Sequence, residues 1–163
     1  LVNELYAQVF FKTYGTPIIG LRYFNVFGPK QSPNGAYAAV IPLFMESLKQ
    51  NVSPIIHGDG EQTRDFTFVE NAVQANIRSF FAPNNAINEV YNVACGNRIS
   101  LNTLWSHLKS IAGINLSANY GPSRKGDVKD SLADISKAKR LLNYNPEFAV
   151  KEGIELTWEI FKR

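Results

Sequence analysis

The stretch PIIGLRYFNVF, from Pro17 to Phe27, is a short run of mainly apolar and aromatic residues. Pro17 opens it and the pair Gly28-Pro29 closes it, and such residues mark the ends of regular structure. A short run that is apolar on both faces is typical of a strand buried in a parallel sheet. Neighbouring parallel strands need a crossover connection, usually a helix, so helical patterns are expected between the β runs of this chain.

Helical periodicity does alternate with further β runs along the chain. Leu1, Leu5 and Val9 follow a four-residue helical spacing, and Ser100 and Gly113 are placed to cap the two ends of a later helix. Further helices are predicted over residues 38–50, 71–81, 101–112, 135–142 and 151–163. Further strands are predicted over residues 54–57, 63–69 and 89–94. This alternation predicts an α/β fold with a largely parallel sheet.

The start of the sequence suggests that the first helix is incomplete. Leu1 already belongs to the helical pattern, with no Met, no signal pattern and no capping residue before it. We therefore expect the chain to be a fragment whose upstream part is missing. The alternative is that a tag or a processing step removed only a few residues.

Composition excludes several classes of protein. The 163 residues are 45% hydrophobic and 19% charged, which is enough apolar surface for a folded domain and too much for a disordered chain. One cysteine and two histidines argue against a disulfide framework and against a metal site. No apolar run approaches the ~20 residues that cross a bilayer, and the basic residues behind the net charge of +3 are scattered. We expect a soluble, cytoplasmic protein that binds neither membrane nor nucleic acid.

Two loops carry residues that could bind phosphate. GDGEQTRDF, residues 58–66, places Arg64 after a glycine turn, and SRKGD, residues 123–127, places Arg124 and Asp127 on a second loop. A planar guanidinium matches phosphate oxygens, and a carboxylate can accept hydrogen bonds from ribose hydroxyls. Two such arginines with one aspartate would suit a nucleoside diphosphate.

The alternative for these residues is ordinary ion pairing at the surface. Arg64 would then pair with Asp65 or Glu61, and Arg124 with Asp127. The sequence carries no glycine-rich dinucleotide fingerprint, phosphate-binding Walker loop or nucleophile elbow that would decide between the two interpretations.

Several segments, taken in order, resemble the extended short-chain dehydrogenase/reductases that act on nucleotide sugars, the NAD-dependent epimerase/dehydratase family. They are LRYFNVFGP at 21–29, NGAYAAVIP at 34–42, GDGEQTRDF at 58–66, YNVA at 91–94 and RKGD at 124–127. The resemblance covers essentially the whole chain. It is strongest to the bacterial UDP-N-acetylglucosamine 4-epimerases.

The resemblance implies that the chain is the C-terminal part of a Rossmann-type α/β enzyme. Residues 1–27 and 66–96 would be the last parallel strands of the NAD-binding domain. Residues 28–65 and 97–163 would form the small α/β lobe that binds the nucleotide sugar. The catalytic Tyr-x-x-x-Lys and the glycine-rich fingerprint of the family would lie upstream of Leu1, so no catalytic residue is expected here, and the parent enzyme would be an NAD-dependent homodimer.

Site residues are carried over from the family by position. Three are expected at the nicotinamide end of NAD: Tyr23, Phe24 and Val26. The others are expected to hold a UDP-sugar: Asn25, Ala39, Val40, Phe44, Ile55, Ile56, His57, Arg64, Arg124 and Asp127.

The expected roles of the substrate residues differ. Arg64 and Arg124 would bind the diphosphate, with Asn25 near it, and Asp127 would accept from the ribose. Ala39 and Val40 would line the nucleotide pocket beside a helix N-terminus. Ile55 to His57 would border the uracil, and Phe44 would line the pocket or pack in the core. Phe44 and His57 depart from the residues expected in the most similar members of the family.

The implied activity is interconversion of UDP-N-acetylglucosamine and UDP-N-acetylgalactosamine. A tyrosinate would remove the hydroxyl proton of the sugar while NAD takes hydride from the same carbon. The chain alone would then be inactive. Two alternatives stay open: another nucleotide-sugar enzyme of the family (uronate epimerase, decarboxylase or dehydratase), and a non-catalytic module that binds a nucleotide sugar or a protein.

Overall fold

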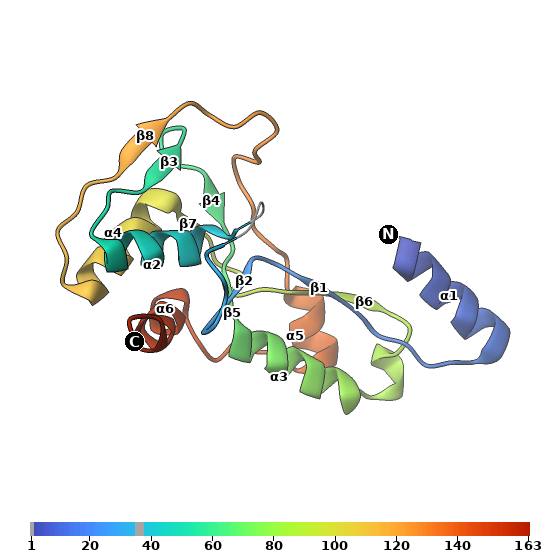
Figure 1. The fold of residues 1–163 in the computed structure, drawn as a ribbon. Coiled ribbons are helices and arrows are strands. Elements are labelled where there is room, and N and C mark those ends of the chain that lie inside the picture. The colour runs from blue at the N-terminus through green and yellow to red at the C-terminus, as the bar shows by residue number, and fades with distance from the viewer. Residues whose placement is uncertain (1, 35–37) are drawn as a thin grey trace.

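The computed structural model describes residues 2–34 and 38–163, so Leu1 and the Gly35-Ala36-Tyr37 part of the second family motif lie outside the described residues. Helices and strands alternate along the described chain (Figure 1), which confirms the predicted α/β architecture. The elements are α1 (Val2–Tyr14), β1 (Gly20–Tyr23), β2 (Val26–Phe27), α2 (Val40–Gln50), β3 (Ile55–His57), β4 (Thr63–Arg64), β5 (Thr67–Phe68), α3 (Val69–Phe80), a 3₁₀ turn (Asn84–Ala86), β6 (Val90–Val93), β7 (Ile99–Ser100), α4 (Leu101–Ala112), β8 (Asn119–Gly121), α5 (Ser136–Leu142) and α6 (Val150–Phe161).

The strands form short pairs, most of them parallel. β1 pairs with β6, β2 with β5, and β3 with β8, all in parallel. The exception among the described residues is the antiparallel pair of β4 with β7. Because the parallel partners are far apart in sequence, helices α2, α3 and α4 cross between them, as the alternating pattern predicted.

The prediction of one strand over residues 17–27 is wrong in detail, because the run is broken at Asn25. Asn25 has a φ of 39°, in the left-handed region, and separates β1 from β2. The predicted strand over residues 63–69 is likewise broken between β4 and β5, around the buried Asp65. The two breaks lie against each other: Nδ2 of Asn25 donates to the carbonyl of Asp65 at 2.9 Å, and the Thr67 hydroxyl donates to the carbonyl of Phe24 at 2.7 Å.

Two apolar clusters hold the chain together. The first joins α2, α4 and α6 to β2, β3 and β5, and its buried aromatic members are Phe27, Phe44, Phe66, Phe68, Trp105 and Trp158. The second joins α3, α5 and β6. Both clusters cross the expected domain boundaries, because Phe27 and Phe68 pack with the lobe helices, and α5 packs on β6. The division of the chain into two functional parts stays a prediction.

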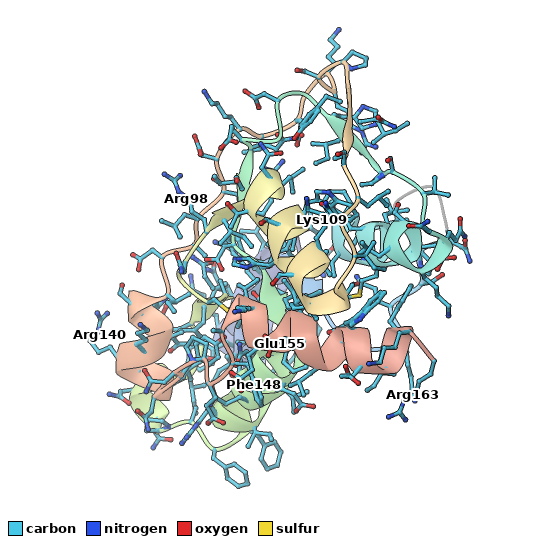
Figure 2. The ribbon with its side chains drawn as sticks, turned by 90° about the vertical axis from the view of Figure 1, so that its left-hand side faces the viewer. Arg98, Lys109, Arg140, Phe148, Glu155 and Arg163 are labelled. Carbon is cyan, nitrogen blue, oxygen red and sulfur yellow. The ribbon has the colours of Figure 1, made fainter. Side chains whose placement is uncertain are left out.

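Helix α6 covers the first cluster at a very close approach. A Cβ added to Gly153 would lie 2.8 Å from Phe68 Cβ and 2.9 Å from Phe27 Cζ. Figure 2 shows α6, marked by Glu155, beside α4, marked by Lys109. Glycine at this helical position therefore lets the backbone of α6 reach the aromatic rings.

Gly153→Ala is expected to lower the free energy of unfolding by about 1–3 kcal/mol, because overpacking of this size exceeds the helix propensity that alanine adds. Urea denaturation of the chain measures the loss. Glu155→Ala is the matched control, because Glu155 lies on the exposed side of the same helix and its replacement should change stability by less than about 0.5 kcal/mol. An unchanged midpoint for Gly153→Ala would show that the rings move aside.

Helix α1 stands apart from the other elements in Figure 1. No residue of α1 is buried, and an ion pair between Glu4 and Arg22 at 2.6 Å links it to β1. A cavity of about 850 Å³ separates α1 from β1 and β6, and none of the predicted site residues lines it. Within the described residues, no helix is long and apolar enough to cross a membrane.

Candidate functional site: an arginine-aspartate cluster beside an apolar cavity

The segment Arg124-Lys125-Gly126-Asp127 forms a tight turn. The Asp127 N–H donates to the Arg124 carbonyl at 3.2 Å, and Gly126 has a φ of 83°, which glycine adopts without strain at the third position of such a turn. The first and fourth residues of a turn lie close together. The turn therefore places the Arg124 and Asp127 side chains beside one cavity, as the lining residues of that cavity show.

The loop that carries this turn is anchored at both ends. Before the turn, β8 pairs with β3, and Gly58 N–H donates to the Gly121 carbonyl at 2.9 Å. After it, Thr63 N–H donates to the Lys129 carbonyl at 2.8 Å, and Ser131 N–H donates to the Thr63 carbonyl at 3.2 Å. In Figure 1 this loop, in orange, leaves β8 and passes over the end of β3 and β4. The turn is thus held above the segment that carries Arg64.

Arg64 reaches the turn and forms an ion pair with Asp127 through Nη2. Its Nη1 donates to the Thr63 carbonyl at 2.7 Å, and the side chain is 17% exposed. Of the two alternative interpretations, ion pairing is therefore present, but with a partner from the other loop rather than Asp65 or Glu61. Arg64 thus pairs directly with Asp127, and Arg124 lies on the same turn as Asp127; these three residues are called the arginine-aspartate cluster. Arg64 itself lines none of the described cavities.

Asp65, the neighbour of Arg64, binds backbone groups and not the arginine. Its side chain is fully buried and accepts from the N–H groups of Cys95 and Gly96, both at 3.0 Å, and of Ala133 at 3.3 Å. Burial raises the pKa of this carboxyl above its usual value, and the backbone hydrogen bonds oppose that shift. Asp65 therefore ties β4 to the ends of β6 and of the loop, and it is not available to Arg64.

An apolar cavity of about 380 Å³ opens beside the arginine-aspartate cluster. Its lining includes the predicted residues Val40, Phe44, Ile55, Ile56, His57, Arg124 and Asp127. Within this wall, Ile55 is 62% exposed, whereas Ile56 and Phe44 are buried. Phe44 packs edge-on against Trp105 with ring centroids 5.3 Å apart, so it belongs to the core as well as to the cavity wall. The volume lies in the range of small-molecule sites in proteins, about 300–1,000 Å³.

His57 and Gln62 close the polar end of the cavity. His57 Nδ1 lies 3.2 Å from the Pro122 carbonyl, which can only accept, so Nδ1 carries hydrogen and Nε2 stays available. Gln62 Nε2 donates to the His57 carbonyl at 2.6 Å across the glycine turn. Both residues also line a second cavity of about 630 Å³, together with Arg124 and Asp127.

Neither Ala39 nor Asn25 lines this cavity. Ala39 precedes α2 as its N-terminal cap residue, adjacent to the lining residue Val40. Asn25 is exposed and is held through its side chain by the backbone of Asp65, one residue from Arg64. The break between β1 and β2 is therefore joined directly to the arginine-aspartate cluster.

The residues expected at NAD lie in that break and on both sides of it. Tyr23 ends β1 and Val26 begins β2, so both are at the carboxyl end of the β1–β6 pair, where open α/β sheets bind ligands. Tyr23 is 47% exposed and its hydroxyl donates to Asn76 Oδ1 at 3.0 Å, whereas Phe24 packs against the second apolar cluster. A contact of these residues with NAD stays a prediction, and the sequence contains no glycine-rich dinucleotide loop.

The structure adds residues that the sequence interpretation missed. Gln62, Leu43, Ser47 and Leu101 also line the apolar cavity. Gln62 lies inside the GDGEQTRDF motif, so its position was a usable signal. The two leucines and the serine carry no motif, and only the packing of α2 and α4 around β3 brings them to the cavity.

Short pairs of mainly parallel strands crossed by helices are the features of an α/β protein of Rossmann type. We compared the sequence of the chain with models of known protein families. The model of the NAD dependent epimerase/dehydratase family matches residues 1–94, and the chain belongs to this family.

Solved structures similar to this chain are nucleotide-sugar epimerases. A UDP-glucose 4-epimerase from Thermotoga maritima is 38% identical with a TM-score of 0.93, over 99% of this chain and 51% of that one. A UDP-N-acetylglucosamine 4-epimerase from Methanobrevibacter ruminantium M1, in complex with UDP-N-acetylmuramic acid, is 40% identical with a TM-score of 0.91, over 97% and 50%. A UDP-glucuronic acid 4-epimerase from Bacillus cereus, with UDP-glucuronic acid and NAD, is 33% identical with a TM-score of 0.86, over 98% and 49%. The chain also spans about half the length of the curated relatives it matches.

Proposed function

We propose that this chain is the nucleotide-sugar-binding part of an NAD-dependent 4-epimerase whose substrate is UDP-N-acetylglucosamine. The observation that carries the proposal is that Arg124 and Asp127 line the apolar cavity, with Arg64 paired to Asp127 behind them. The cluster combines two cations with one carboxylate, so it has the charge and the donors for a diphosphate next to a ribose. The similarity to epimerases crystallised with UDP-sugars supports the same function.

Different residues of this chain would bind different parts of the nucleotide. Arg124 and Arg64 donate to the diphosphate oxygens, and Asp127 accepts from the ribose hydroxyls. The uracil packs on the apolar wall between α2 and β3, where Ile55 is exposed and the available Nε2 of His57 lies at the polar end. Because binding strength is concentrated on the nucleotide, the hexose stays free to present either face to the reacting groups.

Redox chemistry would be supplied by NAD, which takes up and returns a hydride at the reacting sugar carbon. Only three residues of this chain would contact that cofactor: Tyr23, Phe24 and Val26, at the strand ends. Asn25 lies among them and is bonded to the backbone of Asp65, the neighbour of Arg64. The groups that move the proton would belong to the longer protein. The chain alone is therefore a binding part without catalysis.

UDP-glucuronate is a second candidate substrate. The similarity to the Bacillus cereus UDP-glucuronic acid 4-epimerase, at 33% identity over nearly the whole chain, favours it. Both candidates share the nucleotide, so the contacts of Arg64, Arg124 and Asp127 do not distinguish them. A substrate panel of acetylated, plain and uronate UDP-sugars, tested on the longer protein, separates the two.

The chain alone is expected to bind UDP and to convert none of these sugars. Isothermal titration calorimetry measures UDP binding, and chromatography of the nucleotide sugars after incubation with NAD measures conversion. The matched control is ADP, which carries the same diphosphate and ribose with a larger base and should bind at least about tenfold more weakly if the apolar cavity selects uracil. Absence of UDP binding, in a chain shown to be folded by circular dichroism, would contradict the proposed function.

A further inference from the structure

The segment that carries Arg124 and Asp127 lies entirely at the surface. Residues 122–130 are all exposed, and the first buried residue after them is Ala133, which belongs to the second apolar cluster. An exposed segment gains little from the burial of apolar side chains, so hydrogen bonds at its base have to hold it in place. The position of Arg124 and Asp127 at the cavity therefore depends on the residues to which the end of this loop is attached.

The end of the loop is attached to two residues of one short segment. Thr63 binds the backbone of Lys129 and Ser131, at 2.8 and 3.2 Å. Asp65, two residues further along, continues this attachment with its side chain, because its Oδ2 accepts from the Ala133 N–H at 3.3 Å. Asp65 thus holds the loop at the point where the loop enters the core.

The same carboxylate binds the backbone at the carboxyl end of β6. Its Oδ2 also accepts from the Gly96 N–H, and its Oδ1 accepts from the Cys95 N–H, both at 3.0 Å. The loop and the strand end are in close contact here, since a Cβ added to Gly96 would lie 2.9 Å from Cδ1 of Ile135. One side chain therefore joins the loop of Arg124 and Asp127 to the end of the strand.

The link through Asp65 requires the burial of a carboxylate. The side chain is fully buried, and it forms no ion pair among the described residues. A buried charge without a cation is unfavourable unless hydrogen bonds compensate it. A carboxylate has two acceptor oxygens, so it can bind N–H groups of several segments at once, which an apolar side chain of the same size cannot do. The arrangement indicates that a fixed geometry is required at this point.

We propose that Asp65 is a positioning residue of the nucleotide site, which acts through Arg124 and Asp127 by fixing the base of their loop to the carboxyl end of β6. The proposal rests on the proposed function, in which both side chains contact the nucleotide. Because the loop is already held in its binding position, it loses less conformational entropy when the ligand binds. Loss of the Asp65 carboxylate should therefore weaken the binding of a ligand that Asp65 itself does not contact.

The test is a double-mutant cycle on UDP binding, measured by isothermal titration calorimetry of the chain. The four proteins are the unsubstituted chain, Asp65→Asn, Arg124→Ala and the double variant. Asparagine keeps the size of the side chain, but its NH2 group would face N–H donors that now bind a carboxylate oxygen. Circular dichroism confirms that each variant is folded.

The effect of Asp65→Asn is expected to depend on Arg124. In the unsubstituted chain it should weaken UDP binding at least about tenfold, and in the Arg124→Ala chain less than about threefold, a remainder that Asp127 accounts for. The reason is that Asp65 cannot position a guanidinium that is absent. A role of Asp65 in overall stability alone would weaken binding by the same factor in both chains.

Ala133→Pro is a second variant, which breaks the same link from the side of the loop. Proline has no N–H group, so this substitution removes the bond from the loop and leaves the bonds of Asp65 to Cys95 and Gly96. It should weaken UDP binding at least about fivefold, because the loop is then released while the strand end is still held. Its result decides the test if Asp65→Asn does not fold.

Gly153→Ala is the matched control, because it also lowers stability but acts on α6, which lines none of the described cavities. It should change the affinity for UDP by less than about twofold.

The contrary results separate this proposal from the proposed function. If UDP binds to the unsubstituted chain, but the folded variants Asp65→Asn and Ala133→Pro change its affinity by no more than Gly153→Ala does, the positioning proposal is overturned and the proposed function stands. The same conclusion follows if Asp65→Asn weakens binding equally with and without Arg124. If the folded, unsubstituted chain does not bind UDP, the proposed function is overturned, and the positioning proposal with it.

Discussion

Replacement of Arg124 with alanine is expected to raise the KM of the longer, catalytically complete protein for its UDP-sugar by at least about tenfold, because a hydrogen bond to a charged group contributes roughly 1.5–3 kcal/mol. The same substitution should weaken UDP binding to the chain alone by a similar factor. Arg124 lines the apolar cavity and forms no ion pair among the described residues, so its loss would remove the proposed contact with the diphosphate without breaking an ion pair of the fold. Steady-state kinetics measures the change in KM, and calorimetry measures the change in the affinity for UDP.

Lys125→Ala is the matched control for Arg124→Ala. Lys125 lies in the same turn and carries the same charge, but it lines neither of the two cavities that Arg124 lines. Its replacement should change KM by less than about twofold, the size of a screened long-range effect. Equal effects of the two substitutions would assign the contribution of Arg124 to the general positive field and not to contact with the diphosphate.

Asp65→Ala is expected to lower the free energy of unfolding by about 3 kcal/mol or more, because each buried donor left without a partner costs about 1–3 kcal/mol. The buried carboxylate accepts three backbone hydrogen bonds, from Cys95, Gly96 and Ala133, and alanine offers no acceptor to any of them. Urea denaturation followed by circular dichroism measures the loss. Asp59→Ala, which removes an exposed carboxylate that accepts from one N–H group, should cost less than about 1 kcal/mol.

The stability difference between the unsubstituted chain and Asp65→Ala should depend on pH in a defined direction. Burial raises the pKa of Asp65 in the folded chain above its unfolded value, so the folded state binds a proton more readily than the unfolded state. The contribution of this group to stability is therefore largest below the unfolded pKa, and it decreases as the pH rises through the folded pKa. The stability difference between the unsubstituted chain and Asp65→Ala should grow as the pH falls through that interval, and a difference that shrinks there would contradict this account of Asp65.

Local signals in the sequence were sufficient for most of the helices. The side chain of Ser100 accepts from the Thr103 N–H at 3.2 Å, and Gly113 has the left-handed φ of 69° expected of a glycine that ends a helix. Both caps act within a few residues, so the residues themselves define the ends of α4. Helix α1 likewise follows its four-residue spacing although none of its residues is buried.

The breaks in the two β runs were not predictable in the same way. Asn25 and Asp65 lie 40 residues apart, and each interrupts a run that is otherwise apolar and β-rich. An asparagine within such a run does not by itself predict a left-handed backbone conformation. The break exists because its side chain binds the Asp65 carbonyl, while the Asp65 side chain binds backbone groups near the end of β6. Those partners come together only in the folded chain.

The sequence by itself determined the α/β class, the family, most of the helices with the two caps of α4, and the two loops that carry Arg64 and Arg124. These features depend on residues that are close together in the chain or that recur in a family motif. Only the tertiary structure decided that Arg64 pairs with Asp127, 63 residues away, and not with its neighbours Asp65 or Glu61. The physical reason is that the burial of Asp65 and the anchoring of the loop on β3 and β4 determine which carboxylate a guanidinium can reach, and both require the complete fold.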